Sequence, residues 1–266
     1  MSIDIKTKAQ IEKMRLSGRL AAEVLDMLRP LVVPGVSTAE LDERAHDYIV
    51  TRLNALPGKA GYRGFEHTLG TSINGVVWNG VPRDKDVLRD GDIVGIEVAL
   101  IKNSWFGATT RTFLVGKPDA AAKRLVSATE AALAAAIGVV REGARLGDIG
   151  HAIERVAKAA GFSVVREYCG HGIGRGYHEE PEVAHTGRMG SGLWLKKGMV
   201  FTIEPMLNAG GPDVENLGDT VEVVTSDGEL SAQAQHTVLV TETGADILTA
   251  WPNRERAAPR TGRQEG

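Results

Sequence analysis

The sequence is poor in the features that mark exported or membrane-spanning chains. It has one cysteine, Cys169, among 266 residues, so no disulfide can form within the chain, as is typical of a reducing cytoplasm. No apolar run reaches the ~18 residues that suggest a spanning helix. The first residues, MSIDIKTKAQ, lack the apolar core of a secretory signal. These absences predict a cytoplasmic protein with no membrane association.

An excess of charge of one sign is also lacking. The 31 basic residues are balanced by 34 acidic ones, for a net charge of −3, which gives no general reason to bind nucleic acid. Hydrophobic residues make up 42% and charged residues 24%, which is ordinary for a globular protein. This composition excludes a disordered, a collagen-like or a coiled-coil chain.

The same order of elements occurs twice along the chain. The segments LRDGDIVGIEVAL (88–100) and LKKGMVFTIEPML (195–207) align without a gap, with Glu204 on Glu97. Each follows a pair of amphipathic helices and a turn-rich region, so we expect two copies of one helix–helix–strand unit related by a pseudo-twofold axis. The predicted helices cover residues 11–31, 39–52, 120–141 and 146–160, and the predicted strands lie within 76–78, 90–101, 110–115 and 237–241.

These patterns predict one α+β domain over residues 1–251. Its halves are expected at about 10–117 and 118–250, with the site between them. The segment 252–266 has no apolar periodicity and is predicted to be a flexible tail.

The two aligned glutamates are candidate site residues. Side chains alternate along a strand, so Glu97 and Glu204 point away from their apolar neighbours. If the halves pack together, the two carboxylates face each other, and a buried charge is costly unless it is paired or bound to metal. The alternative is that each glutamate lies on a solvent-facing side of its strand.

Two of the seven histidines lie in a glycine-rich segment, REYCGHGIGRGYHEEPE (166–182). The segment matches neither a phosphate-binding nor a dinucleotide-binding loop. A glycine-rich turn with His171 and His178 favours metal binding or acid–base chemistry; the alternative is that His171 only completes a turn. His236 and Gln235 point to opposite faces, so only one of them can face the site. His67 and His185 have no partner visible in the sequence.

Several motifs together resemble the bacterial type I methionine aminopeptidases, from about Ile5 to Leu248. They are CGHGIGRGYHEEP (169–181), FTIEPM (201–206), SINGVV (72–77), DGDIV (90–94) and the SAQ…HT frame (231–237). The resemblance implies the pita-bread (creatinase/aminopeptidase) fold, with two pseudo-symmetric halves around a central antiparallel sheet. It also implies removal of N-terminal methionine from nascent proteins at a site of two divalent metals (Co, Mn, Fe or Zn).

The family's five metal ligands are two aspartates, one histidine and two glutamates, and they carry over unevenly. His171 and Glu204 match, and Glu97 takes the position of the first aspartate. The second, bridging aspartate is replaced by Ala108, so that ligand is lost. The bridging glutamate is replaced by Gln235, whose neutral amide is a weak ligand.

The resemblance assigns further roles. Of the family's two catalytic histidines, His178 is kept and the other is Asn79. The methionine pocket corresponds to Tyr62, Phe65, Tyr177 and Val221, and the monovalent-cation site to Asn74, Val76 and Ser231.

The departures lower the charge available to hold metal. Four carboxylates balance two dications in the family, whereas this chain offers only Glu97 and Glu204. We therefore expect at most one divalent ion, or none, and little or no peptidase activity, with a pocket that still binds the N-termini of Met peptides or nascent chains. The ribosome is a further expected partner, and the protein is expected to be a monomer. The alternative is an active metal-dependent type I methionine aminopeptidase, for which a single-ion site and a narrowed substrate range are options.

Overall fold

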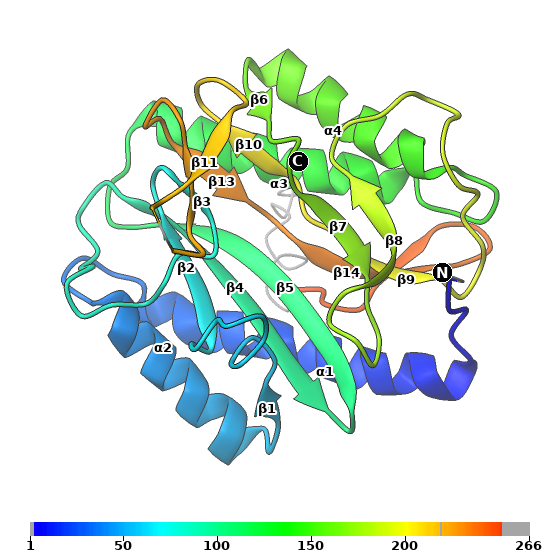
Figure 1. The fold of residues 1–266 in the computed structure, drawn as a ribbon, viewed down its shortest axis with the longest axis horizontal. Coiled ribbons are helices and arrows are strands. Elements are labelled where there is room, and N and C mark those ends of the chain that lie inside the picture. Colours follow the sequence, from blue (N-terminus) through cyan, green and yellow to red (C-terminus); the bar gives the residue numbers. More distant parts are fainter. Residues whose placement is uncertain (1–2, 219, 252–266) are drawn as a thin grey trace, which may run out of the picture.

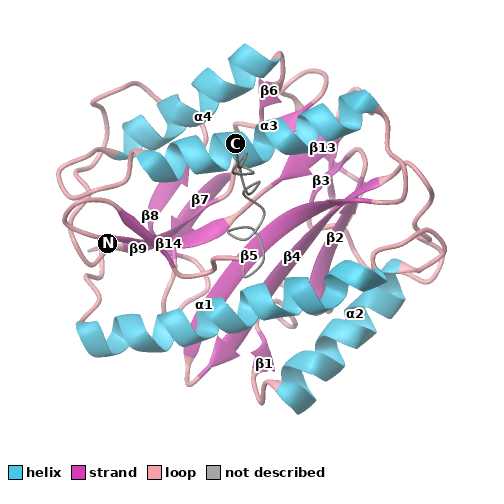
Figure 2. Cartoon of the chain, turned by 180° about the vertical axis from the view of Figure 1, so that it is seen from behind, coloured by secondary structure: helices cyan, strands magenta, loops and turns pink. Residues whose placement is uncertain are grey.

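The computed structural model describes residues 3–218 and 220–251 of the chain. Within these ranges the helices are α1 (Lys8–Leu28), η1 (Arg29–Leu31), α2 (Thr38–Asp47), η2 (Tyr48–Arg52), α3 (Ala120–Gly138) and α4 (Leu146–Ala160). They form two pairs, with α1 and α2 along one side of the molecule and α3 and α4 along the other (Figure 1). Seen from behind, α1 and α3 lie in front of the strands, so the helices cover one face of the strand layer (Figure 2).

The strands of the first half are built on one long antiparallel hairpin. They are β1 (Leu56–Pro57), β2 (Leu69–Ile73), β3 (Val76–Trp78), β4 (Ile93–Lys102) and β5 (Trp105–Leu114). In the β4–β5 hairpin, Glu97 pairs with Thr110 and Ala99 with Ala108. Glu97 and Ala108 therefore lie on the same face of the hairpin.

The second half repeats the design with shorter strands. They are β6 (Ser163–Val164), β7 (Cys169–Gly172), β8 (Glu179–Ala184), β9 (Val200–Ile203), β10 (Met206–Asn208), β11 (Val214–Asn216), β12 (Val223–Thr225), β13 (Ser231–Gln233), β14 (His236–Val240) and β15 (Ala245–Ile247). The largest sheet has the order β15-β14-β9-β7-β8, and all its pairings are antiparallel.

Each helix pair packs on the strands of its own half. One apolar cluster joins α3 and α4 to β9 and β14 and includes Leu133 and Phe201. A second cluster joins α1 and α2 to β4 and includes Leu25 and Ile96. The predicted α+β architecture of two similar halves is confirmed, while the proposed boundaries at 10–117 and 118–250 remain a prediction.

The predicted elements differ from the observed ones mainly at their ends. Helix α1 starts before the expected residue 11 because the Thr7 side chain accepts a hydrogen bond from the Gln10 backbone, and Gln10 bonds back to Thr7. Strand β5 starts at Trp105 rather than at the predicted Thr110, because the hairpin pairing with β4 continues to Lys102. Helix α4 has the predicted bounds.

Two predictions concern the chain as a whole. The segment predicted to be a flexible tail, 252–266, lies outside the described residues. In the part of the chain that the structure describes, no helix combines the length and the apolar character needed to cross a membrane.

One histidine without a role in the sequence analysis is part of the core. His185 follows β8 and is only 2% exposed. Burial disfavours its charged form and lowers the pKa of His185 to about 4 from the ordinary 6.5.

We therefore expect the free energy of unfolding to fall as the pH is lowered from about 6.5 to about 4. In this window the unfolded chain binds a proton at residue 185 that the folded chain does not, which corresponds to about 3 kcal/mol over the whole range. His185→Gln removes this contribution, so its stability should depend less on pH. Urea unfolding at several pH values measures both slopes, and equal slopes for the variant and the wild type would contradict the assignment.

Candidate active site

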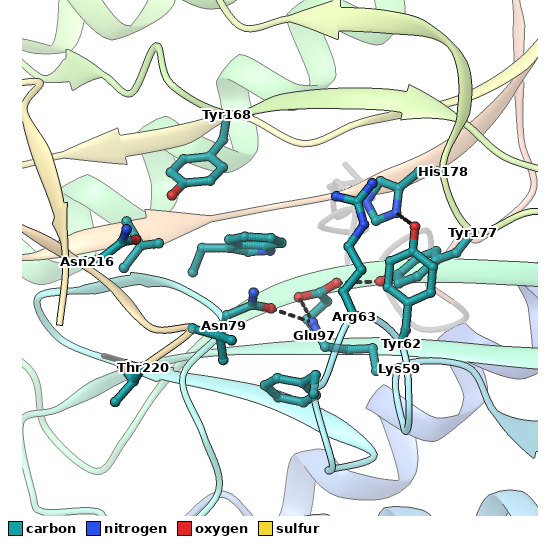
Figure 3. A pocket seen from close by; sticks show the side chains of 14 residues that line it. Lys59, Tyr62, Arg63, Asn79, Glu97, Tyr168, Tyr177, His178, Asn216 and Thr220 are labelled. Atoms are coloured by element: carbon teal, nitrogen blue, oxygen red, sulfur yellow. Dashed lines mark hydrogen bonds and ion pairs between the residues drawn. The ribbon is translucent and has the colours of Figure 1, made fainter. Parts of the chain in front are cut away.

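A pocket of about 310 Å³ lies where the loops before β2 and after β7 meet strands β3 and β4 (Figure 3). Aromatic side chains from both halves form much of its lining: Tyr62, Phe65, Trp78, Tyr168 and Tyr177. Val221 also lines it and is 39% exposed. All four residues predicted for the methionine pocket thus line one cavity; their role in binding remains a proposal.

Glu97 is the carboxylate of this pocket. It is buried on β4, where the Lys59 Nζ lies 2.6 Å from its Oε2 and the Tyr177 hydroxyl donates a 2.6 Å hydrogen bond to its Oε1. Burial alone would raise the pKa of Glu97, but the Lys59 charge and these two hydrogen bonds hold it below its ordinary value. Glu97 is therefore ionised at neutral pH and not solvent-facing, which excludes the alternative considered for it.

Lys59 is the residue that the sequence analysis missed. It is 3% exposed, and its ammonium also donates a 2.9 Å hydrogen bond to Asn79 Oδ1 (Figure 3). The Phe65 ring centroid is 4.7 Å from the Nζ atom, within range of a cation–π contact. A lone lysine in the segment LPGKAGY gives no spacing signal, and its contact with Glu97 depends on tertiary packing.

Glu204 follows β9 and is also buried. The Thr202 hydroxyl donates to its Oε1 at 2.7 Å, and the Gln233 amide donates to its Oε2 at 3.2 Å. Burial raises the pKa of Glu204 to about 8, and the nearby negative charge of Glu97 adds to this shift. At neutral pH the Glu204 carboxyl is mostly protonated, so it supplies little negative charge.

The two histidines of the glycine-rich segment lie side by side and are uncharged. Their ring centroids are 4.0 Å apart. Burial lowers the pKa of both, that of His178 to about 3. The Nδ1 of His171 donates to the Gly172 carbonyl at 2.9 Å, and its Nε2 lies 3.6 Å from Glu204 Oε1. His171 therefore does more than complete a turn, because its second nitrogen faces a site carboxyl.

His178 is held by Tyr62, another residue that lines the pocket. Its Nδ1 shares a 2.7 Å hydrogen bond with the Tyr62 hydroxyl, and the two rings are stacked. The predicted catalytic residue His178 and the predicted pocket residue Tyr62 therefore form one unit. The other predicted catalytic position, Asn79, is bonded to Lys59.

Two of the three departures at predicted ligand positions, Ala108 and Gln235, lie where the halves meet. The Gln235 side chain accepts a 2.7 Å hydrogen bond from the Thr110 hydroxyl, and the Gln235 and Thr110 backbones are also paired. Gln235 thus faces the boundary between the two halves, which we call the seam. The His236 side chain instead shares a hydrogen bond with Thr249 on the other side of its strand. Ala108 is fully buried and has only a methyl group to offer.

The side chains present do not fit a two-metal centre. Among residues 3–218 and 220–251, no three His, Cys, Asp or Glu side chains come together as a group that could hold a metal ion. In this structure Glu97 is paired with Lys59, and both Glu204 oxygens accept hydrogen bonds from protein groups. Metal binding by Glu97, His171 and Glu204 remains a prediction.

The predicted monovalent-cation site is built around Asn74. Its backbone carbonyl accepts a 2.9 Å bond from the Ser231 amide, and Val76 follows on β3. The Asn74 side chain bonds Asp92 and the Ile93 amide. These contacts bring Asn74 and Ser231 together, and cation binding there remains a prediction.

The fold and the matched sequence define the class of protein. The sequence profile of metallopeptidase family M24 matches residues 12–242, which include every site residue described above. A solved dipeptidase, PepE from Mycobacterium ulcerans, has a TM-score of 0.73 at 25% identity, with 93% of this chain and 60% of that chain covered. The fold is the pita-bread fold, and the chain belongs to metallopeptidase family M24.

Within this family, the similarity to one group of enzymes is high. The chain is 51% identical over 249 residues to the methionine aminopeptidase of Escherichia coli (strain K12), with 94% of each chain covered. The crystal structure of the methionine aminopeptidase from Rickettsia prowazekii has a TM-score of 0.91 at 46% identity and covers 94% of this chain and 100% of that chain. The predicted resemblance to bacterial type I methionine aminopeptidases is therefore confirmed.

The buried ion pair gives a stability test. Glu97→Gln leaves the Lys59 ammonium without its counterion, so the free energy of unfolding should fall by about 3–5 kcal/mol. The double variant Lys59→Met/Glu97→Gln removes both charges and should recover much of that loss. The matched control is Glu242→Gln, because the Lys197–Glu242 pair is exposed and worth about 0–1 kcal/mol. Urea unfolding compares the three, and equal costs for the two single variants would contradict a buried ion pair.

Proposed function

We propose that this member of the methionine aminopeptidase family binds N-terminal methionine segments and has little or no two-metal peptidase activity. The supporting observation is the charge of the site. Ala108 and Gln235 supply no anion, and Glu97 is ion-paired with Lys59. Two dications require anionic bridging oxygens, which this arrangement does not offer.

The retained pocket supports binding. Tyr62, Phe65 and Tyr177 provide aromatic walls, and thioether sulfur makes favourable contacts with aromatic rings. A cavity of about 310 Å³ is in the range for one apolar side chain with its flanking backbone. The proposed partners are Met peptides and nascent chains. We propose that the protein is a monomer that binds them in the cytoplasm, near the ribosome.

A second candidate function is an active aminopeptidase. The identity of 51% to the Escherichia coli enzyme favours it, as does the retention of His171, His178 and Glu204. In that case metal binding would have to displace Lys59 from Glu97 and deprotonate Glu204.

Metal content and turnover distinguish the two candidates. Purified protein dialysed against Co, Mn, Fe or Zn should hold substantially less than two equivalents, measured by elemental analysis. Hydrolysis of a Met-Ala peptide should stay near background, because each missing acid–base or ligand group typically costs ~10²–10⁴-fold in rate. Two tight sites in calorimetry, or a kcat in the usual range of about 1–10³ s⁻¹, would establish the active enzyme instead.

Binding can be tested at the rim of the pocket. Val221→Arg places a charged side chain at the cavity, so the affinity for a labelled Met-Ala peptide should fall at least tenfold in fluorescence anisotropy. Leu193→Arg is the matched control, because Leu193 is exposed to a similar degree and does not line the pocket. If both variants bind like the wild type, this cavity is not the binding site.

A further inference from the structure

The ammonium of Lys59 has the surroundings of a bound cation. It contacts Glu97 Oε2 at 2.6 Å and Asn79 Oδ1 at 2.9 Å, and the face of Phe65 covers it at 4.7 Å. An anionic oxygen, a neutral oxygen and an aromatic face are the partners that stabilise an ammonium ion away from water.

Two of the residues that distinguish this site contact that ammonium. Glu97 and Asn79 differ from the expected aspartate and histidine, and both bond Lys59 directly. Gly70 is the cross-strand partner of Glu97 on β2. A Cβ atom at residue 70 would lie 3.2 Å from Glu97 Oε2 and 3.5 Å from the Lys59 Nζ, so glycine leaves room for the pair. The departures at Glu97 and Asn79 are therefore parts of one arrangement around Lys59.

We infer that the Lys59 ε-ammonium is the fixed internal cation of this pocket and takes the place of a divalent ion beside Glu97. A divalent ion at Glu97 would either lie against this positive charge or displace Lys59 from three contacts. The pocket is then ordered and charge-balanced without metal. The inference rests on the proposed function, which it deepens by naming the group that keeps metal out.

The test is Mn²⁺ binding by the Lys59→Met variant. Equilibrium dialysis and thermal unfolding, each with Mn²⁺ alone, measure this binding. Loss of the ammonium leaves Glu97 without a counterion, so Mn²⁺ should bind at least tenfold more tightly than to the wild type, and the Tm should rise with Mn²⁺. The matched control is Lys6→Met. Lys6 is also buried and pairs with Glu179 at 2.7 Å, but it does not line the pocket. Lys6→Met should lose stability without gaining Mn²⁺ affinity.

Folding does not limit the test. If Lys59→Met folds poorly, refolding should depend on Mn²⁺, whereas Lys59→Met/Glu97→Gln should fold without any response to the metal. If neither folding nor binding of Lys59→Met responds to Mn²⁺, or if Lys6→Met gains the same affinity, the inference is wrong.

A second experiment tests the effect of Lys59 in a variant whose two predicted ligand positions are restored. Ala108→Asp/Gln235→Glu returns both anionic bridges and should still hold fewer than two equivalents of Mn²⁺ while Lys59 is present. Adding Lys59→Met should raise the content toward two. Equal content with and without Lys59 would overturn the inference. Met-Ala hydrolysis by the wild type would instead contradict the proposed function, so the two failures are distinguishable.

Discussion

The seam between the two halves determines where the site lies and what it can hold. Thr110 on β5 and Gln235 are paired through their backbones and also through their side chains. The Thr237 hydroxyl donates a 2.8 Å bond to the carbonyl of Ala108. Besides the apolar core of each half, a third apolar cluster joins Ala99 and Ala108 of the first half to Ile173 and Val200 of the second, so polar and apolar contacts together set how the halves meet.

The carboxyl groups of the site find their partners within the protein. Of the two glutamates that the repeat brings together, one is paired with a lysine and the other is mostly protonated at neutral pH. Tyr177 donates to Glu97, and Thr202 donates to Glu204, so each carboxyl group is satisfied within the protein. Buried polar groups that are fully bonded favour a single arrangement of the surrounding side chains.

Much of this was predictable from local sequence, and the exceptions have physical causes. The repeat placed Glu97 and Glu204 in equivalent positions, and the glycine-rich motif identified His171 and His178. Lys59 could not be found in this way, because its contact with Glu97 depends on how the loop before β2 folds back over β4. The loss of two ligand types, read from the sequence, stays a prediction, and the sequence did not indicate that the Lys59 ammonium lies beside Glu97.

The shape of the pocket also depends on the N-terminal segment, which lies far from the pocket residues in the sequence. Lys6 bonds Glu179 through its side chain and Gly198 through its backbone, and Glu179 in turn accepts a bond from the Gly176 amide. The turn that presents Tyr177 to the pocket is thus braced by residues near the beginning of the chain. A proteolytic cut just after Lys6 would remove that brace and loosen one wall of a cavity to which the lost peptide contributes no atom.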